Sequence, residues 1–398
     1  IRDLRFAARL RASDLGSGRL SGMADIHLDP KQSRVRLTSL EADAVELLSA
    51  DGLSGLSGGK VGIRGEIRHQ KGESAVDLDL DGNLAVGEVL HGAFYANLSA
   101  HEALLKLTGR ADWATRSLEA RELSLRIPEL ARVQLAGLVR PDLQELSATL
   151  ESAPLAPAFE RYLRAPLLER DSPFKDLALD GRLDGGLMLR RTPTEFSLAG
   201  HLDPRALALA LPGSQLEIVG LNGRLPLLYQ QGALAGETGT HSGQLDFARL
   251  DLGPLHLEQG SLPVEATPNR LTVASFPQGR LAGGSMHLAD LRAAFAESGP
   301  TLAARIRFEE IDLAQLSREL EWAPLSGRLN ADLGEIRYAD KTLSSAGEIH
   351  AELFGGTLDI AKISLRDPFS RYRTIHGDIE FSGIDLQQLT QTFEFGEM

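Results

Sequence analysis

The stretch Val76-Asp77-Leu78-Asp79-Leu80-Asp81 decides the fold class of this chain. Apolar and acidic residues alternate there at every position, so an extended backbone puts the apolar side chains on one face and the carboxylates on the other. The same period of two recurs along the chain, for example in Leu123–Ile127 and Leu245–Phe247. Antiparallel strands with one dry face and one wet face have this pattern. The sequence therefore predicts a mostly β protein.

Turn signals divide these alternating segments at short intervals. Asp81-Gly82, Asp180-Gly181 and Asn222-Gly223 are dipeptides that favour tight turns. We therefore expect many short strands in a sandwich, a barrel or one continuous repetitive sheet. The clearest helix is predicted at residues 156–169, where Pro157 suits the first turn. This predicts a β segment at 1–154, a short helical insertion or cap at 155–172, and a second β segment at 173–398.

An internal repeat lies near the C-terminus. The segment Ile306–Ser317 recurs as Ile379–Thr390, at an offset of 73 residues (379 minus 306). A Gly-Gly segment upstream, Gly283–Leu288, recurs as Gly355–Ile360 at an offset of 72 (355 minus 283). In each copy the Gly-Gly pair opens a strand, a later strand carries Ile and Phe, and an Asp caps a short helix. Such a unit cannot bury its own apolar face, so it stacks on a neighbour.

The composition excludes several classes of protein. There is no Cys, which rules out disulfides and thiolate metal sites, although it does not select a compartment. The net charge of -13 and the absence of a basic stripe argue against nucleic acid as a partner. Gly55–Gly59 matches G-x-S-x-G, but a Gly/Ser-rich stretch precedes it and a strand follows, so we interpret it as a flexible turn.

No metal, cofactor or catalytic centre is predicted. Asp77, Asp79 and Asp81 would lie about 6.6 Å apart along one strand, too far apart for a calcium site, and we interpret them as a solvated outer face. The ten His residues have no zinc-site spacing. The chain also has no apolar run near the roughly 18 residues that span a bilayer. Because it begins at Ile1, we expect an internal fragment of a longer protein.

A one-sided sheet must cover its apolar face, by a second sheet, by closing into a barrel, or by curling into an open trough. Aromatic residues, which fill closed cores, are only 5% of this chain, and the apolar residues are mainly aliphatic. An aliphatic trough suits acyl chains, because each buried methylene contributes about 0.8 kcal/mol without any specific contact. The sequence thus favours a lipid-binding groove. A structural or assembly scaffold of the cell envelope, such as a chaperone of outer-membrane proteins, is the alternative.

The repeated I-x-F-x-x-I-D-L-x-Q-L-[ST] segments, the strand start Phe354–Gly356 and the C-terminal Phe393–Met398 carry a family resemblance. With these motifs the chain resembles the AsmA-like bacterial envelope proteins, closest to the YdbH type, with TamB and YhdP as relatives. The resemblance is specific over about residues 280–398 and only architectural before them. It implies an elongated, repetitive, highly curved antiparallel β-sheet that forms an open apolar groove (a β-taco), with a few short helices.

The resemblance also implies a location and partners. These are the periplasm, an inner-membrane anchor outside this fragment, and an outer membrane or outer-membrane-associated lipoprotein toward which phospholipids move. No catalytic residues or cofactors are implied. Alternation selects the residues expected to line the groove and contact acyl chains, and a register slip of one residue would invert the choice. They are Ala304, Ile306, Phe308, Ile349, Ala351, Leu353, Leu358, Ile360, Ile379 and Phe381.

Overall fold

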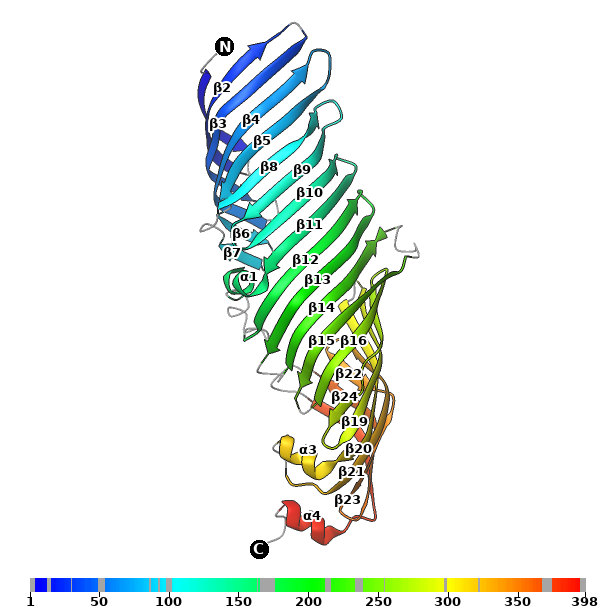
Figure 1. Cartoon of the computed structure of the whole chain (residues 1–398). Coiled ribbons are helices and arrows are strands. Elements are labelled where there is room, and N and C mark those ends of the chain that lie inside the picture. Colours follow the sequence, from blue (N-terminus) through cyan, green and yellow to red (C-terminus); the bar gives the residue numbers. More distant parts are fainter. Residues whose placement is uncertain are drawn as a thin grey trace. The chain divides into compact units, whose positions relative to one another are not determined.

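Most of the described chain is β-strand. The computed structural model describes residues 4–12, 16–29, 31–48, 54–85, 87–91, 94–97, 102–162, 164, 176–211, 216–232, 239–253, 255–296, 299–320, 323–366 and 374–393. These residues form 25 strands and three short helices, α1 (Leu155–Tyr162), α3 (Leu313–Glu319) and α4 (Leu386–Phe393) (Figure 1). The strands pair in antiparallel fashion, for example β1 with β2 and β24 with β25. The predicted mostly-β, antiparallel sheet architecture is confirmed.

The chain divides into two compact units. The first unit comprises residues 1–175, 179–202 and 230–235, and the second comprises 176–178, 203–229 and 236–398. The division falls within strand β13 (Phe196–Leu211). The three segments predicted from sequence divide the chain at α1 instead, and residues 165–175 of the predicted insertion lie outside the described residues.

Neighbours along the chain are neighbours in the sheet of the first unit. Strands β1 to β5 pair in order, β5 pairs with β8, and β8 to β12 again pair in order. The start of β4, Ser54–Ser57, pairs with β6, and β6 pairs with β7. The strands are β1 (Leu4–Ala12), β2 (Gly16–Leu28), β3 (Gln32–Leu48), β4 (Ser54–Gln70), β5 (Ala75–Ala85), β6 (Glu88–His91), β7 (Phe94–Asn97), β8 (Glu102–Asp112), β9 (Ser117–Ile127), β10 (Ala131–Val139), β11 (Gln144–Pro154) and β12 (Ala178–Arg191).

Helix α1 belongs to this unit. It follows β11 directly and packs beside β7 and β11 (Figure 1). Pro157 lies in its first turn, where a missing N–H costs no hydrogen bond. Phe159 is its buried anchor. The described helix ends at Tyr162.

The second unit is also an antiparallel meander, with two branch points. Strand β16 pairs with both β17 and β18, and β21 pairs with both β22 and β23. Its strands are β14 (Leu216–Gln231), β15 (His241–Leu252), β16 (Leu255–Thr267), β17 (Arg270–Ser275), β18 (Gly279–Leu281), β19 (Gly284–Ala296), β20 (Gly299–Asp312), β21 (Gly327–Ala339), β22 (Thr342–Ser345), β23 (Glu348–Leu353), β24 (Gly356–Arg366) and β25 (Thr374–Ser382).

Four predicted turns are wrong, because the chain continues through them as strand. Asp81-Gly82, Asp180-Gly181 and Asn222-Gly223 lie inside β5, β12 and β14, and the G-x-S-x-G segment Gly55–Gly59 lies inside β4. Gly181 and Gly223 have φ of 100° and 123°, a backbone conformation that glycine adopts without strain. These glycines therefore let a long strand bend instead of reversing the chain. No helix follows the segment in β4, so it also lacks the context of a nucleophile elbow.

The same backbone-to-side-chain hydrogen bond occurs at three bends in the strands. The non-glycine residues Ser152, Ala206 and Glu310 have φ of 48°, 47° and 56°. Each turns its N–H away from the ladder, and a side-chain oxygen of the next strand accepts it. The acceptors are Asp184 at 2.7 Å, Asn222 at 2.7 Å and Asn330 at 2.9 Å. The strands can thus curve without leaving these backbone donors unpaired.

The two copies of the C-terminal repeat have matching backbone geometry. Ala282–Gly284 and Phe354–Gly356 both pass through the left-handed region, with φ of 43° and 76° in the first copy and 50° and 71° in the second. The N–H of Asp312 donates to the Ala282 carbonyl at 2.9 Å, and that of Asp385 donates to the Phe354 carbonyl at 2.8 Å. The same bond therefore joins the strand start to the helix start in each copy.

The predicted aspartate caps of the two repeat helices are confirmed. The Asp312 carboxylate accepts the Gln315 N–H at 3.0 Å at the start of α3. The Asp385 carboxylate accepts the N–H groups of Gln387 at 2.8 Å and Gln388 at 3.3 Å at the start of α4. Each cap satisfies donors that have no partner within the helix. Helix α3 buries Leu313 and Ser317 against the sheet.

Candidate apolar binding face

Three cross-strand rows of apolar residues and glycines define one face of the first unit. Directly opposed residues in antiparallel strands point to the same side, so the register identifies each row. The rows cross nine strands, β2 to β5 and β8 to β12. The first row is Ala24, Leu37, Gly65, Leu80, Leu107, Leu123, Leu135, Ala148 and Leu187; the second is Ile26, Val35, Ile67, Leu78, Gly109, Ala120, Gly137, Leu146 and Leu189; the third is Gly22, Leu40, Ile63, Gly82, Leu105, Leu125, Val133, Leu150 and Gly185.

The side chains of this apolar face are not sealed into a core. Among the 27 row positions, only Ala24 and Leu37 have buried side chains, and the remaining Leu, Ile and Val side chains are half-buried. Both clusters of buried apolar side chains found among the described residues belong to the second unit. The first unit therefore presents a broad aliphatic surface that its own chain covers only in part.

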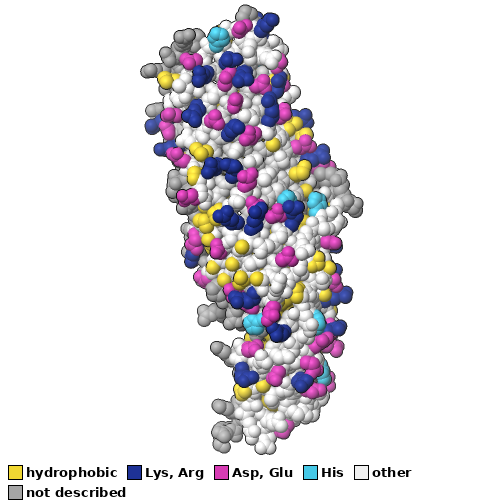
Figure 2. Space-filling model, viewed as in Figure 1, with side chains coloured by type: hydrophobic (Ala, Val, Ile, Leu, Met, Phe, Trp, Pro, Cys, Tyr) yellow, Lys and Arg dark blue, Asp and Glu magenta, His cyan; other side chains and the backbone are white. Residues whose placement is uncertain are grey.

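The opposite face of the same strands is polar. The Asp77 carboxylate forms a salt bridge with the Arg121 guanidinium at 2.9 Å. The Glu66 carboxylate forms one with the Arg34 guanidinium at 2.6 Å. Lys106 contacts Glu122 at 3.1 Å. Figure 2 shows positive and negative side chains intermingled over the visible surface. Such exposed pairs contribute about 0–1 kcal/mol each, so their main effect is to keep this face in water. The solvated outer face predicted for Asp77, Asp79 and Asp81 agrees with these contacts.

Titratable groups with shifted pKa values lie on the polar side. A hydrogen bond to Glu122 raises the pKa of the Lys106 ammonium. The hydrogen bond from Arg68 is the largest effect that lowers the pKa of the Glu66 carboxyl. None of the three rows contains a titratable side chain, so the apolar face offers no acid, base or nucleophile. Among the described residues, no group of His, Asp or Glu side chains could hold a metal ion.

One open hollow of about 620 Å³ lies over β3, β4, β5, β8, β9 and the start of β10. Its lining mixes Ile63 and Leu105 of the apolar rows with Arg64, Lys106 and Arg126 of the polar face. Since its residues come from both faces and Lys106 already contacts Glu122, the hollow does not select one class of ligand.

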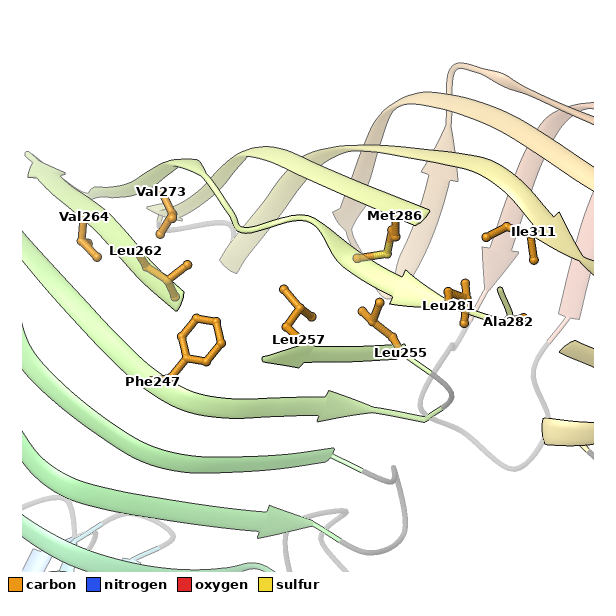
Figure 3. Close-up of a cluster of buried hydrophobic side chains, with 10 residues drawn as sticks. All are labelled: Phe247, Leu255, Leu257, Leu262, Val264, Val273, Leu281, Ala282, Met286 and Ile311. Atoms are coloured by element: carbon orange, nitrogen blue, oxygen red, sulfur yellow. The ribbon is translucent and has the colours of Figure 1, made fainter. Parts of the chain in front are cut away.

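In the second unit, much of the apolar face is buried by the chain itself. Ten buried side chains from β15, β16, β17, β18, β19, β20 and the β18–β19 connection point into one space (Figure 3). They are Phe247, Leu255, Leu257, Leu262, Val264, Val273, Leu281, Ala282, Met286 and Ile311. A second cluster joins α3 and α4 to β23, with Leu313, Leu353 and Phe354 buried and Leu389 packed beside them. Here the chain covers its own apolar face.

The ten residues predicted to line a groove share one face of the second unit. Phe308 lies in a cross-strand row with Ile349, Ile360 and Ile379. Ala351 lies in the adjacent row with Leu358 and Phe381. Ile306 faces Leu288, Ala304 faces Ile336, and Leu353 faces glycines on both neighbouring strands. Strand β21 completes the rows between β20 and β23 with Leu329 and Ala331, which the sequence reasoning missed.

Exposure rises along these rows toward β25. Ala304, Ala351 and Leu353 are buried, whereas Ile379 and Phe381 are both 59% exposed. The other five, Ile306, Phe308, Ile349, Leu358 and Ile360, are half-buried. The predicted set therefore extends from buried positions to exposed positions on β25.

The larger apolar face, in the first unit, contains none of the residues that were predicted to line the groove. Its alternation is visible in the sequence, as in Val76–Asp81 and Leu123–Ile127. Register and bulges decide which alternating segments meet, and these depend on the folded sheet. Only the pairing shows that the rows continue across nine strands.

Comparison with protein-family models and with curated proteins finds no match for this chain. Among the described residues, no helix has the length and apolar character needed to cross a bilayer.

Proposed function

We propose that this protein binds phospholipid acyl chains on the apolar face of its first unit and carries them between membranes. The observation that supports this most is the set of three unbroken apolar rows across nine strands, with half-buried aliphatic side chains. Soluble proteins rarely leave a contiguous apolar patch of this kind without a binding partner.

The energetics favour an alkyl chain as that partner. Burying a dozen methylenes contributes about 10 kcal/mol at most, before the entropy of ordering the chain is subtracted. The rows contain no charged or hydrogen-bonding side chain that would fix an acyl chain at one position. An alkyl chain can therefore occupy equivalent positions along the sheet, which is what movement along a groove requires.

The setting follows from the family resemblance. The repeated motif and its Asp-capped helices support membership of the AsmA-like envelope proteins, which implies a periplasmic protein anchored in the inner membrane by a segment outside residues 1–398. The proposed partners are the inner membrane and an outer membrane or its lipoprotein. Movement of phospholipid toward the outer membrane is part of this proposal.

A pair of adjacent substitutions on β9 tests the binding. Leu123 lies on the apolar face and Ser124 on the polar face. We expect Leu123→Asp to reduce the phospholipid that co-purifies with the protein, because a carboxylate in an apolar surface costs several kcal/mol to desolvate. Ser124→Asp is the matched control and should leave the lipid content unchanged. The measurement is lipid mass spectrometry of the purified chain, normalised to protein.

The outcomes separate the two candidate functions. Phospholipid in the wild-type chain that falls only in Leu123→Asp supports lipid binding. The proposal is contradicted if the wild-type protein carries no bound phospholipid and also takes up none from vesicles. Recovery of unfolded outer-membrane β proteins in place of lipid would instead favour the envelope scaffold.

A further inference from the structure

The apolar face of the second unit closes on itself at one bend. Strand β16 turns Leu255 and Leu257 inward before the bend and Leu262 and Val264 inward after it. The inward positions change from odd to even numbers, with Glu258 and Gln259 both exposed between them. Because side chains alternate strictly in a regular strand, this change marks a sharp local twist. Residues from both sides of the bend belong to the same buried cluster.

Phe247 occupies the bend itself. It lies opposite Gly260 on β16 and is only 2% exposed. A Cβ at Gly260 would contact the Phe247 ring at 2.6 Å and would overlap Pro277, so the absence of a side chain there gives the ring its place. Figure 3 shows the ring between Leu257 and Leu262, the two sides of the bent strand. Phe247 therefore fills the space that an alkyl chain would need.

The first unit has no such filling side chain among the described row positions. At its bend in β4, Gly65 has φ of 144° and a Cβ would overlap the Asp79 carbonyl oxygen. Its row partners are Leu37 and Leu80, which are aliphatic. The bend is thus made by backbone alone, and the apolar face stays accessible.

From this difference we infer that Phe247 limits where acyl chains bind: they occupy the face of the first unit and are excluded from the second unit around Phe247. The inference rests on the proposed lipid binding. It assigns Phe247 a positioning role for the cargo, through occupation of the space at the bend and not through contact with a reacting group.

Site-specific photocrosslinking in the whole chain tests the assignment. A small diazirine amino acid replaces Leu135 of the first unit or Leu262 of the cluster, one at a time. Each protein is incubated with vesicles of phosphatidylethanolamine and phosphatidylglycerol, irradiated, and analysed by mass spectrometry for lipid adducts. Both probes are then repeated in Phe247→Ala and in the milder Phe247→Leu, and circular dichroism checks that each variant keeps its strand content.

In the wild-type background we expect about tenfold more adduct at position 135 than at 262. This ratio corresponds to a difference of about 1.4 kcal/mol in binding free energy between the two positions. Phe247→Ala should raise labelling at 262 several-fold and leave position 135 unchanged, with a smaller rise for Phe247→Leu. Equal labelling at both positions in the wild type overturns the inference while keeping lipid binding. Labelling at 262 that stays low in both folded variants overturns the role of Phe247. Absence of adduct at both positions overturns the proposed function and this inference together.

Discussion

The two units are built from the same kind of strand and differ in what covers the apolar side. In the first unit, three rows of aliphatic side chains cross nine strands and stay half-buried. In the second unit, comparable rows converge on ten buried side chains, one of which is Phe247. One-sided alternation therefore predicts a strand with a dry face, and it does not distinguish a binding surface from a core. The geometry of the bend decides whether the apolar face is open or buried, because it determines whether the two sides of a curved sheet touch.

The difference predicts unequal costs for truncating apolar side chains. Ile311, in the cluster, has 0% exposure, whereas Leu107 is half-buried. We expect Ile311→Ala to lower the free energy of unfolding by about 2–5 kcal/mol, and Leu107→Ala by about 1 kcal/mol, because the open face leaves no closed cavity. Denaturant unfolding, with hydrogen exchange to assign the loss to a unit, measures both. Equal losses would mean that the first unit is packed as tightly as the second.

Glycines at close strand contacts should be equally intolerant of side chains in both units. Gly65 and Gly327 have φ of 144° and 133°, and a Cβ at either would overlap a backbone carbonyl of the neighbouring strand. We expect Gly65→Ala and Gly327→Ala each to cost roughly 1–3 kcal/mol. Gly72, with φ of 93° and no atom within 4 Å of a Cβ, is the control that isolates the backbone cost alone. If Gly65→Ala behaved like Gly72→Ala, close approach of strands would not be what fixes the curvature.

The repeat offers a smaller, internally matched test within the second unit. Asp312→Ala and Asp385→Ala each remove a carboxylate cap, and each should destabilise its helix by about 1 kcal/mol. Asparagine at either position retains an acceptor oxygen and should recover most of that stability. Amide exchange in α3 and α4 reports the effect helix by helix. An unchanged exchange rate in α4 after Asp385→Ala would show that its packing on β23, and not the cap, holds the helix.

Acid should weaken both units by the same mechanism and to a small extent. The N–H of Thr115 lowers the pKa of the Asp112 carboxyl in the first unit, and the N–H of Gly334 lowers that of Asp332 in the second. A carboxyl with a folded pKa below its unfolded value stabilises the fold above the unfolded pKa. That contribution disappears as the pH falls through the folded pKa, below about pH 4. Asp112→Asn should flatten the acid dependence of unfolding midpoints, and an unaltered pH profile would exclude this carboxyl as a contributor.

Features of the fold that depend on residues close in sequence could be predicted, and features that depend on pairing between distant strands could not. Local alternation and the Asp312 and Asp385 caps are short-range features, and both were predicted correctly. The Asx-Gly pairs were misinterpreted as turns because a positive φ at Gly181 or Gly223 bends a strand as readily as it reverses one. The contrast between an open face and a closed cluster depends on register across many strands and on the Phe247–Gly260 pairing, which no local pattern contains.

The most direct test of lipid binding uses two adjacent residues of β8. Leu107 lies in the first apolar row, and Lys106 points to the opposite face, where it contacts Glu122. A photoreactive amino acid placed at each position in turn samples the two faces at one point of the same sheet. Phospholipid adducts about tenfold more abundant at 107 than at 106 are the predicted result. Equal labelling of the two faces, or protein adducts without lipid at 107, would contradict lipid binding on this face.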